Sequence, residues 1–219
     1  MQSEGAIPIF SQGCVFCAQR GPILLRTDHM FLRLDDSPIV EGHALVCTQQ
    51  HYPSFADIPN DLAPELERIL HLAREVFEDA YGVCSFFEHG RTASCTVRDP
   101  NERFCYHAHL HVSPSTVDLA NCAAEKLPQI EVQSWYDVIA EGKKGTYGYL
   151  YIETPRQQRY FFPIVRPIGQ HFLRTCLATG VGDPSLADWT RIVGTERSLR
   201  LMEQAESKLM PRIVQAKVV

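Results

Sequence analysis

Three histidines alternate with small apolar residues in the segment 105–112, Cys-Tyr-His-Ala-His-Leu-His-Val. The pattern over residues 104–112 predicts a β-strand, and side chains of a strand point alternately to its two faces. His107, His109 and His111 would then share one face. Imidazoles titrate near neutral pH and suit nucleophilic attack, proton transfer or metal ligation. The strand therefore predicts a chemical site on one face and apolar core on the other.

A second group with metal-binding chemistry is a CxxC element formed by Cys14 and Cys17. Such a pair can be half a zinc site, a redox pair or a chance spacing. The Gly-Pro break at residues 21–22 argues against the helix that a redox motif requires. Five further cysteines stand singly, mostly among apolar neighbours, which is typical of small buried hydrophobes. These are Cys47, Cys84, Cys95, Cys122 and Cys176.

The composition narrows the class of protein. Of 219 residues, 45% are hydrophobic and 21% are charged, a balance typical of a globular chain. No apolar run approaches the ~18 residues that a membrane span requires. The formal net charge of −5 argues against a surface that coats nucleic acid. Residues 1–13 contain no Lys or Arg and so predict no secretory signal, which makes us expect a reducing, cytoplasmic environment.

Short strands and one long helix are expected to position these residues. Apolar residues at helical spacing predict a helix over 61–81, with Asn60 or Asp61 capping its start and Gly82 its end. Around it we expect strands at 23–26, 29–34, 43–48, 83–88 and 104–112. Beyond a soft boundary at 115–146, the pattern predicts a strand pair at 147–153 and 159–165. Helices follow at about 168–179 and 184–209, the second one with an interruption at Gly194.

With these motifs in place, the sequence resembles the histidine triad family of nucleotide hydrolases and transferases. Residues 107–113 match the family motif of three alternating histidines. Residues 35–51, Asp-x-x-Pro-x-x-x-Gly-His-x-Leu-Val-x-x-x-x-His, resemble the family's upstream signature at its usual spacing. The CxxC element is similar to that of the zinc-carrying members. Together these motifs cover residues 14–114 in the family's order.

The resemblance implies an α+β fold of the histidine triad type, with an antiparallel sheet of about five strands and one long helix packed on it. We therefore expect a catalytic domain at residues 1–125. A C-terminal extension at 126–219, consisting of a β-hairpin and helices, is expected to pack on that domain. Family members often form homodimers through the helix and an edge strand, so a homodimer is one expectation. No membrane partner and no general binding of nucleic acid are expected.

The resemblance also implies roles for the histidines. His109 matches the nucleophile that attacks the α-phosphorus of a nucleotide and forms a covalent nucleotidyl-histidine. His111 matches the residue that donates a hydrogen bond to the phosphate as charge develops. In zinc-carrying members the first triad histidine is a metal ligand, so we expect a structural zinc ion with no open coordination position. Its expected ligands are Cys14, Cys17, His51 and His107, and an unmetallated CxxC is the alternative.

The expected nucleotide contacts include two departures from the family pattern. Asp35 matches the acidic residue that takes the ribose hydroxyls, with Asp36 as a substitute and a simple Asx turn as the alternative. Residues 88–90, Glu-His-Gly, stand where family hydrolases commonly carry Asn-x-Gly, and Glu88 and His89 are candidate proton donors to the leaving group. Arg103 stands just ahead of the histidine strand, where a Gln-Ser or Gln-Thr pair is frequent, and is a candidate phosphate contact.

The activity that the resemblance implies is hydrolysis at the α-phosphate of a nucleoside phosphate ester, anhydride or phosphoramidate, releasing a nucleoside monophosphate. Related transferases tend to carry Gln at the third triad position, so His111 favours hydrolysis. One alternative is a nucleotidyltransferase or phosphorylase that passes the nucleotide to a phosphate-containing acceptor. A second alternative is a nucleotide- or RNA-binding adaptor in which the C-terminal extension dominates.

Overall fold

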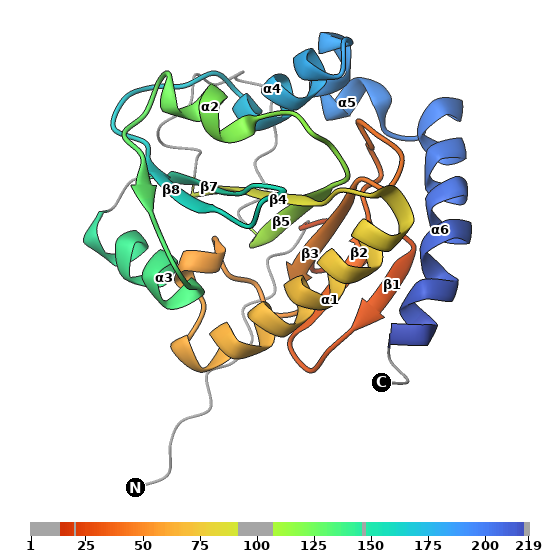
Figure 1. Cartoon of the computed structure of the whole chain (residues 1–219), viewed down its shortest axis with the longest axis horizontal. Helices are drawn as coiled ribbons and strands as arrows, with labels where there is room; N and C mark the ends of the chain where they lie inside the picture. Colours follow the sequence, from red (N-terminus) through yellow and green to blue (C-terminus); the bar gives the residue numbers. More distant parts are fainter. Residues whose placement is uncertain (1–13, 20, 92–106, 146–147, 217–219) are drawn as a thin grey trace, which may run out of the picture.

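The chain is built around one antiparallel sheet, which confirms the expected α+β class. The structure is a computed structural model that describes residues 14–19, 21–91, 107–145 and 148–216. Within those residues the sheet has eight strands in the order β1-β2-β3-β5-β4-β7-β8-β6 (Figure 1). The strands are β1 Ile23–Arg26, β2 Met30–Leu34, β3 Ala44–Thr48, β4 Ser85–Gly90, β5 His109–Ser113, β6 Ile130–Glu131, β7 Tyr149–Glu153 and β8 Arg159–Pro163.

Helices cover both faces of this sheet. The α-helices of the described residues are α1 Ala63–Tyr81, α2 Leu119–Ala124, α3 Trp135–Lys144, α4 Phe172–Gly180, α5 Trp189–Ile192 and α6 Glu196–Ala216. Helices α1, α3 and α6 supply one apolar core, and α2, α4 and α5 supply a second one. Neighbouring residues of β7 alternate between the two, since Tyr151 belongs to the first core and Leu150 to the second. The two cores therefore lie on opposite faces of the sheet.

Helix α1 agrees with the expected long helix but begins differently. Its apolar side chains, such as Leu66, Leu70 and Phe77, are buried against the sheet. Gly82 ends the helix in the left-handed conformation (φ 76°), and its N–H donates to the Glu78 carbonyl. The predicted side-chain cap from Asn60 or Asp61 is wrong, because residues 60–62 form a 3₁₀ turn. Its backbone bonds satisfy the first amide groups in place of a cap.

The histidine strand lies in the middle of the sheet, between β3 and β4. His111 faces Leu45 of β3 and Phe87 of β4. The predicted strand at 104–112 is regular only from His109 onward, and residues 104–106 lie outside the described residues. Ala108 is still held by β3 and the loop after it, because Thr48 N–H donates to its carbonyl and its own N–H donates to Tyr52.

The expected alternation along the histidine strand is present. Ala108, Leu110 and Val112 are fully buried in the core beneath α1. The strand predicted at 83–88 is found two residues later, as β4. Glu88 and His89 therefore lie on a strand and point to opposite faces of the sheet.

The C-terminal extension continues the same sheet. The predicted strand pair is present as β7 and β8, and β7 pairs with β4. The segment that leads from β5 to β7 contains α3, which the sequence pattern did not reveal. Helix α3 begins with a capping box formed by Ser134 and Asp137. Helix α6 packs against α1, β1 and β2 (Figure 1), and a turn at Gly194 precedes it as expected. The division into residues 1–125 and 126–219 stays a prediction. Three strands after residue 125, namely β6, β7 and β8, belong to the same sheet as the others.

Two of the single cysteines do not stand alone. Cys122 of α2 and Cys176 of α4 form a disulfide, with 6.5 Å between their Cα atoms. The expectation that both are isolated core residues is therefore wrong, because packing of α2 against α4 brings together positions 54 residues apart in the sequence. Cys47 and Cys84 are buried as expected, and Cys95 lies outside the described residues.

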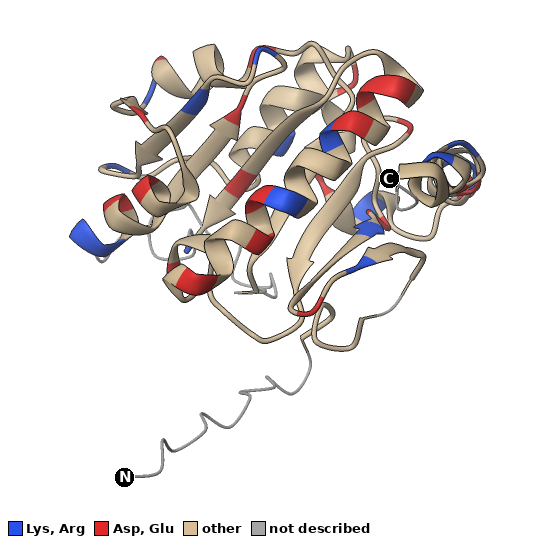
Figure 2. Cartoon of the chain, turned by 60° about the horizontal axis from the view of Figure 1, so that its bottom comes forward, with Lys and Arg blue, Asp and Glu red and all other residues tan. Residues whose placement is uncertain are grey.

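Acidic and basic residues are interspersed along the helices in the view of Figure 2, where α1 carries both kinds. In the ranges that the structure describes, no helix has the length and apolar character needed to cross a membrane.

Candidate active site and metal centre

His109 stands at the start of β5 with its ring orientation fixed by the backbone. Its Nδ1 lies 2.7 Å from the His107 carbonyl oxygen. A carbonyl can only accept, so Nδ1 carries the proton and Nε2 presents a lone pair. Burial lowers the pKa of His109, which keeps the imidazole neutral. The ring is partly exposed and stacks on Phe16, with centroids 4.7 Å apart. A neutral imidazole with a directed lone pair is the form required of a nucleophile.

His111 receives the opposite orientation through a chain that begins at a backbone amide. Ile39 N–H donates to His43 Nδ1 over 3.2 Å, so the proton of neutral His43 is on Nε2. That nitrogen lies 3.0 Å from His111 Nδ1 and donates to it. His111 must then carry its own proton on Nε2. Burial lowers the pKa of His43 to about 4 and that of His111 well below its usual value, so both rings are neutral. His111 can therefore donate to an anionic oxygen.

His43 is thus a functional residue that the sequence reasoning left as a buried residue at the start of a strand. The signal was present in the upstream signature, where His43 stands eight residues after Asp35. What the sequence could not show is the register that places β3 beside β5, which pairs Leu45 with His111. Phe87 of β4 completes the setting of His111 by stacking on its ring, with centroids 4.5 Å apart and planes at 11°.

Asp35 lies beside these rings, but its oxygens are engaged within the protein. Oδ1 accepts hydrogen bonds from the Ser37 N–H (2.9 Å) and hydroxyl (3.0 Å), which forms the Asx-type turn given as its alternative role. Oδ2 accepts from Arg174 of α4 at 2.9 Å. Burial would raise the pKa of Asp35, but Arg174, His43 and the Ser37 hydrogen bonds hold it at about 2. The sequence reasoning did not find Arg174, which stands 139 residues further along the chain.

The other expected nucleotide contacts are distributed differently. Glu88 faces the α1 side of the sheet, where it accepts from the Phe55 N–H (2.9 Å) and the Tyr149 hydroxyl (2.6 Å). Burial raises the pKa of Glu88 to about 8. His89 lies on the histidine side and accepts the Leu173 N–H at 3.0 Å, and burial lowers its pKa to about 3. The structure therefore brings His89 near the histidines and Glu88 to the opposite face, while Arg103 lies outside the described residues.

A separate cluster joins the CxxC element to the histidine strand. The ligand atoms of Cys14, Cys17, His51 and His107 all lie within 4.8 Å of one another. Cys17 Sγ is 3.3 Å from His51 Nδ1 and 3.5 Å from His107 Nδ1. Cys14 Sγ is 3.6 Å from His107 Nδ1, and the two Nδ1 atoms are 3.3 Å apart.

These separations fit a tetrahedral metal site. With zinc–sulfur bonds of about 2.3 Å and zinc–nitrogen bonds of about 2.05 Å, tetrahedral angles put S···N at about 3.5 Å and N···N at about 3.3 Å. The His107 ring is also oriented correctly, because its Nε2 lies 2.7 Å from the Thr48 carbonyl oxygen. Nε2 therefore carries the proton, and the lone pair of Nδ1 points into the cluster. Such a hydrogen bond from the second ring nitrogen is typical of a metal-bound histidine.

The family profile of the HIT domain, the histidine triad domain, matches residues 19–116. The match covers somewhat less than half of the chain, and it shows that residues 19–116 are similar to the HIT domain. An uncharacterised HIT-like protein of Saccharolobus solfataricus is 29% identical over 110 residues, which are 47% of this chain and 73% of that protein.

Similar solved structures include a hypothetical histidine triad nucleotide-binding protein from Sulfolobus tokodaii, with 20% identity, 47% of this chain and 68% of that chain covered, and a TM-score of 0.38. A HIT family protein from Bacillus anthracis has 17% identity, covers 48% of this chain and 74% of its own, and has a TM-score of 0.39. A zinc-bound histidine triad family protein from Mycobacterium smegmatis has 18% identity, covers 47% and 74%, and has a TM-score of 0.35.

Proposed function

We propose that the chain is a nucleotide hydrolase that cleaves a nucleoside phosphate ester, anhydride or phosphoramidate at the α-phosphate. The similarity of residues 19–116 to the HIT domain suggests nucleotide hydrolase or transferase activity at the coarser level. The observation that carries the finer proposal is the pair of complementary tautomers on β5. His109 presents a lone pair on Nε2, whereas His111 presents an N–H on Nε2.

Two steps follow from this pair. His109 Nε2 attacks the α-phosphorus, so that a P–N bond forms while the bond to the leaving oxygen or nitrogen breaks. The His111 N–H donates to a phosphate oxygen on which charge accumulates. Water then attacks the phosphorus of the nucleotidyl-histidine, the P–N bond breaks, and a nucleoside monophosphate leaves with His109 neutral again. A histidine adduct suits the second step because a phosphoramidate is labile enough to hydrolyse.

We also propose that Cys14, Cys17, His51 and His107 hold a structural zinc ion. The donor set and its separations support this, and four protein ligands leave no position for substrate. The ion would fasten the CxxC loop to the strand that carries His109, and Phe16 of that loop stacks on the His109 ring. We assign the binding and orientation of the phosphate group, and proton transfer at it, to the protein's own side chains and not to the zinc ion.

Two expectations about the molecule's surroundings stay predictions. A homodimer built on the long helix would have to accommodate α6, which packs against α1. A cytoplasmic location is retained as a prediction.

Hydrolysis can be tested by turnover of a nucleoside phosphoramidate and a dinucleoside polyphosphate in ¹⁸O-labelled water. We expect one labelled oxygen in the monophosphate, and loss of turnover by about a thousandfold or more in His109→Ala. His71→Ala is the matched control, because His71 is an exposed histidine of α1 and should keep the parent rate. Phosphate or another phosphate-containing acceptor is added in a parallel reaction. Nucleotide recovered in the acceptor with no label in monophosphate would establish the transferase instead.

A further inference from the structure

A buried arginine of the C-terminal extension reaches the carboxylate beside the triad. Arg174 of α4 is 4% exposed. Its Nη1 donates to Asp35 Oδ2 at 2.9 Å, and its Nη2 donates to the Ser37 carbonyl at 2.8 Å. Longer bonds to the carbonyls of Leu186 (3.4 Å) and Ala187 (3.3 Å) hold the guanidinium in place. These four hydrogen bonds fix the guanidinium of Arg174 in this position.

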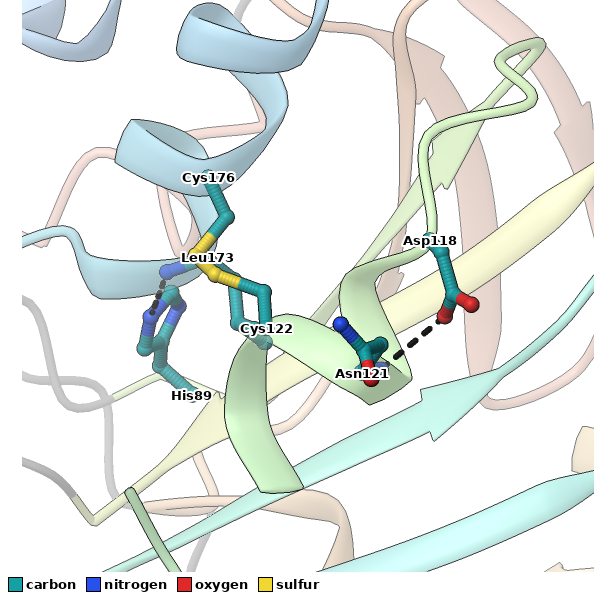
Figure 3. The surroundings of a disulfide bond; sticks show 6 residues. All are labelled: His89, Asp118, Asn121, Cys122, Leu173 and Cys176. Atoms are coloured by element: carbon teal, nitrogen blue, oxygen red, sulfur yellow. Dashed lines mark hydrogen bonds between the residues drawn. A yellow bond between two sulfur atoms is a disulfide. The ribbon is translucent and has the colours of Figure 1, made fainter. Parts of the chain in front are cut away.

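Two further contacts hold helix α4 beside the triad. The position of Arg174 therefore does not depend on its hydrogen bond to Asp35 alone. The Leu173 N–H donates to His89 on β4, and the disulfide between Cys176 and Cys122 joins α4 to α2 (Figure 3). In Figure 3 the disulfide and the His89 contact lie on neighbouring turns of the same helix. The extension thus forms part of the wall of the histidine site.

The arrangement uses most of the hydrogen-bonding capacity of Asp35. A carboxylate offers about four lone-pair sites, two on each oxygen. Ser37 takes both sites on Oδ1, and Arg174 takes one on Oδ2. The remaining site adjoins His43 Nε2, which lies 3.7 Å from Oδ2. Two neighbouring hydroxyls of a sugar need two neighbouring acceptor sites, and Asp35 does not have them.

The neighbouring carboxylate is also engaged by an arginine. Asp36 forms an ion pair with Arg33. The nearly buried guanidinium of Arg33 also donates to the Leu34 carbonyl, which fixes this pair. Both acidic side chains of the loop after β2 are therefore bound to arginines of the same chain.

We propose that Arg174 is a positioning residue which withdraws Asp35 from sugar recognition, so that this site accepts 2′-deoxyribose and ribose nucleotides alike. The inference rests on the proposed function and narrows its substrate class. Recognition then depends on the phosphate and the leaving group, which meet His109 and His111. The extension sets this property through a single buried ion pair.

The test compares ribose substrates with their 2′-deoxy and 2′,3′-dideoxy analogues, as nucleoside 5′-phosphoramidates of all common bases. Binding of the corresponding monophosphates is measured alongside kcat/KM. In the full-length parent we expect ribose-to-deoxyribose ratios within about threefold, whereas a hydroxyl bound to a charged carboxylate would contribute about tenfold or more. Asp35→Asn should leave the ratio unchanged.

Variants of the arginine separate its effect on Asp35 from a general structural effect. Arg174→Met frees an oxygen of Asp35 and should create a ribose preference of about tenfold, which Asp35→Asn in the same chain removes. Arg174→Lys keeps the charge at Asp35 and should keep the parent ratio. Arg197→Met is the matched control, because Arg197 of α6 donates to the carbonyls of Pro38 and Ile39 in the same loop but not to Asp35.

A parent enzyme that prefers ribose by tenfold or more, with the preference lost in Asp35→Asn, overturns the inference and leaves the proposed function intact. An unchanged ratio in a folded Arg174→Met variant also overturns it. Should that variant not fold, the parent and Asp35→Asn ratios still decide. Absence of both turnover and binding for every nucleotide overturns the inference together with the proposed function.

Discussion

Replacement of Arg174 by Met should destabilise the protein far more than replacement of a comparable arginine. Arg174 and Asp35 are both almost fully buried, at 4% and 6% exposure. Removing one partner of a buried ion pair leaves an uncompensated charge, which destabilises proteins by about 3–5 kcal/mol. The pKa of Asp35 gives an independent lower figure. Its fall from 3.8 to about 2 corresponds to roughly 2 kcal/mol of stabilisation at neutral pH, after the opposing effect of burial has been overcome.

The assay is urea-induced unfolding of the parent, Arg174→Met, Asp35→Asn and the double variant at pH 7. We expect a loss of about 3–5 kcal/mol for Arg174→Met. The double variant should be at least about 1.5 kcal/mol more stable than the sum of the single losses predicts, because the stranded carboxylate has been removed. Arg197→Met, which loses two bonds to carbonyl oxygens from a partly exposed position, should lose only about 1 kcal/mol.

The dependence of the free energy of unfolding on pH has a defined sign. The folded pKa of Asp35 is depressed, so its contribution is complete above pH 3.8 and is lost as the pH falls toward 2. In Arg174→Met the pKa of Asp35 rises, because Arg174 no longer opposes the effect of burial, so the variant's carboxyl takes up a proton at a higher pH than the parent's. The stability gap between parent and Arg174→Met should therefore be largest at neutral pH and narrow as the pH falls. Equal losses for Arg174→Met and Arg197→Met, or additivity within about 0.5 kcal/mol in the cycle, would refute the reasoning.

Three further predictions concern other parts of the molecule. Cys17→Ser should abolish retention of about one zinc ion per chain after gel filtration and lower Tm, as measured by elemental analysis and calorimetry; unchanged zinc content would contradict the metal site. Reduction of the disulfide, or Cys122→Ser, should lower the free energy of unfolding by about 4 kcal/mol, from the chain entropy of a loop that joins residues 54 apart; no loss in urea unfolding would show that the bond does not form. Because the pKa of His43 falls from 6.5 to about 4, its neutral form gives roughly 3 kcal/mol that is present above pH 6.5 and lost on acidification toward pH 4. His43→Asn should flatten that part of the stability–pH curve, and a curve identical to the parent's would count against the buried neutral imidazole.

Local patterns predicted the part of the fold that local chemistry determines. The alternation along the histidine strand, the apolar face of α1 and its end at Gly82 all follow from periods and conformations within a few residues. Helix α3 was not predicted, because its ten residues lie in a mixed segment where the Ser134–Asp137 capping box was the only strong local signal. The extension of β4 to Gly90 matters more, since it places both Glu88 and His89 within a strand, where adjacent side chains point to opposite faces and only His89 lies on the side of the triad.

The site was predictable where its residues belong to motifs and not where they depend on tertiary contacts. The two cysteines and two histidines of the metal cluster belong to sequence motifs, and their ligand atoms lie close together in the structure. Arg174 has no local feature that distinguishes it from other arginines, and only the packing of α4 brings it to Asp35. The disulfide between Cys122 and Cys176 has the same origin, because its partners stand on helices with no mutual signal in the sequence.

The central claim, that His109 forms a covalent bond to the nucleotide, is tested most directly by mass measurement of the enzyme quenched in acid-free conditions within one turnover. We expect an adduct with the mass of one nucleoside monophosphate minus water, located on His109 by peptide fragmentation and absent in His109→Ala. It should disappear at the rate at which monophosphate is released. Turnover at the parent rate with no adduct, or with the adduct on another residue, would contradict the account.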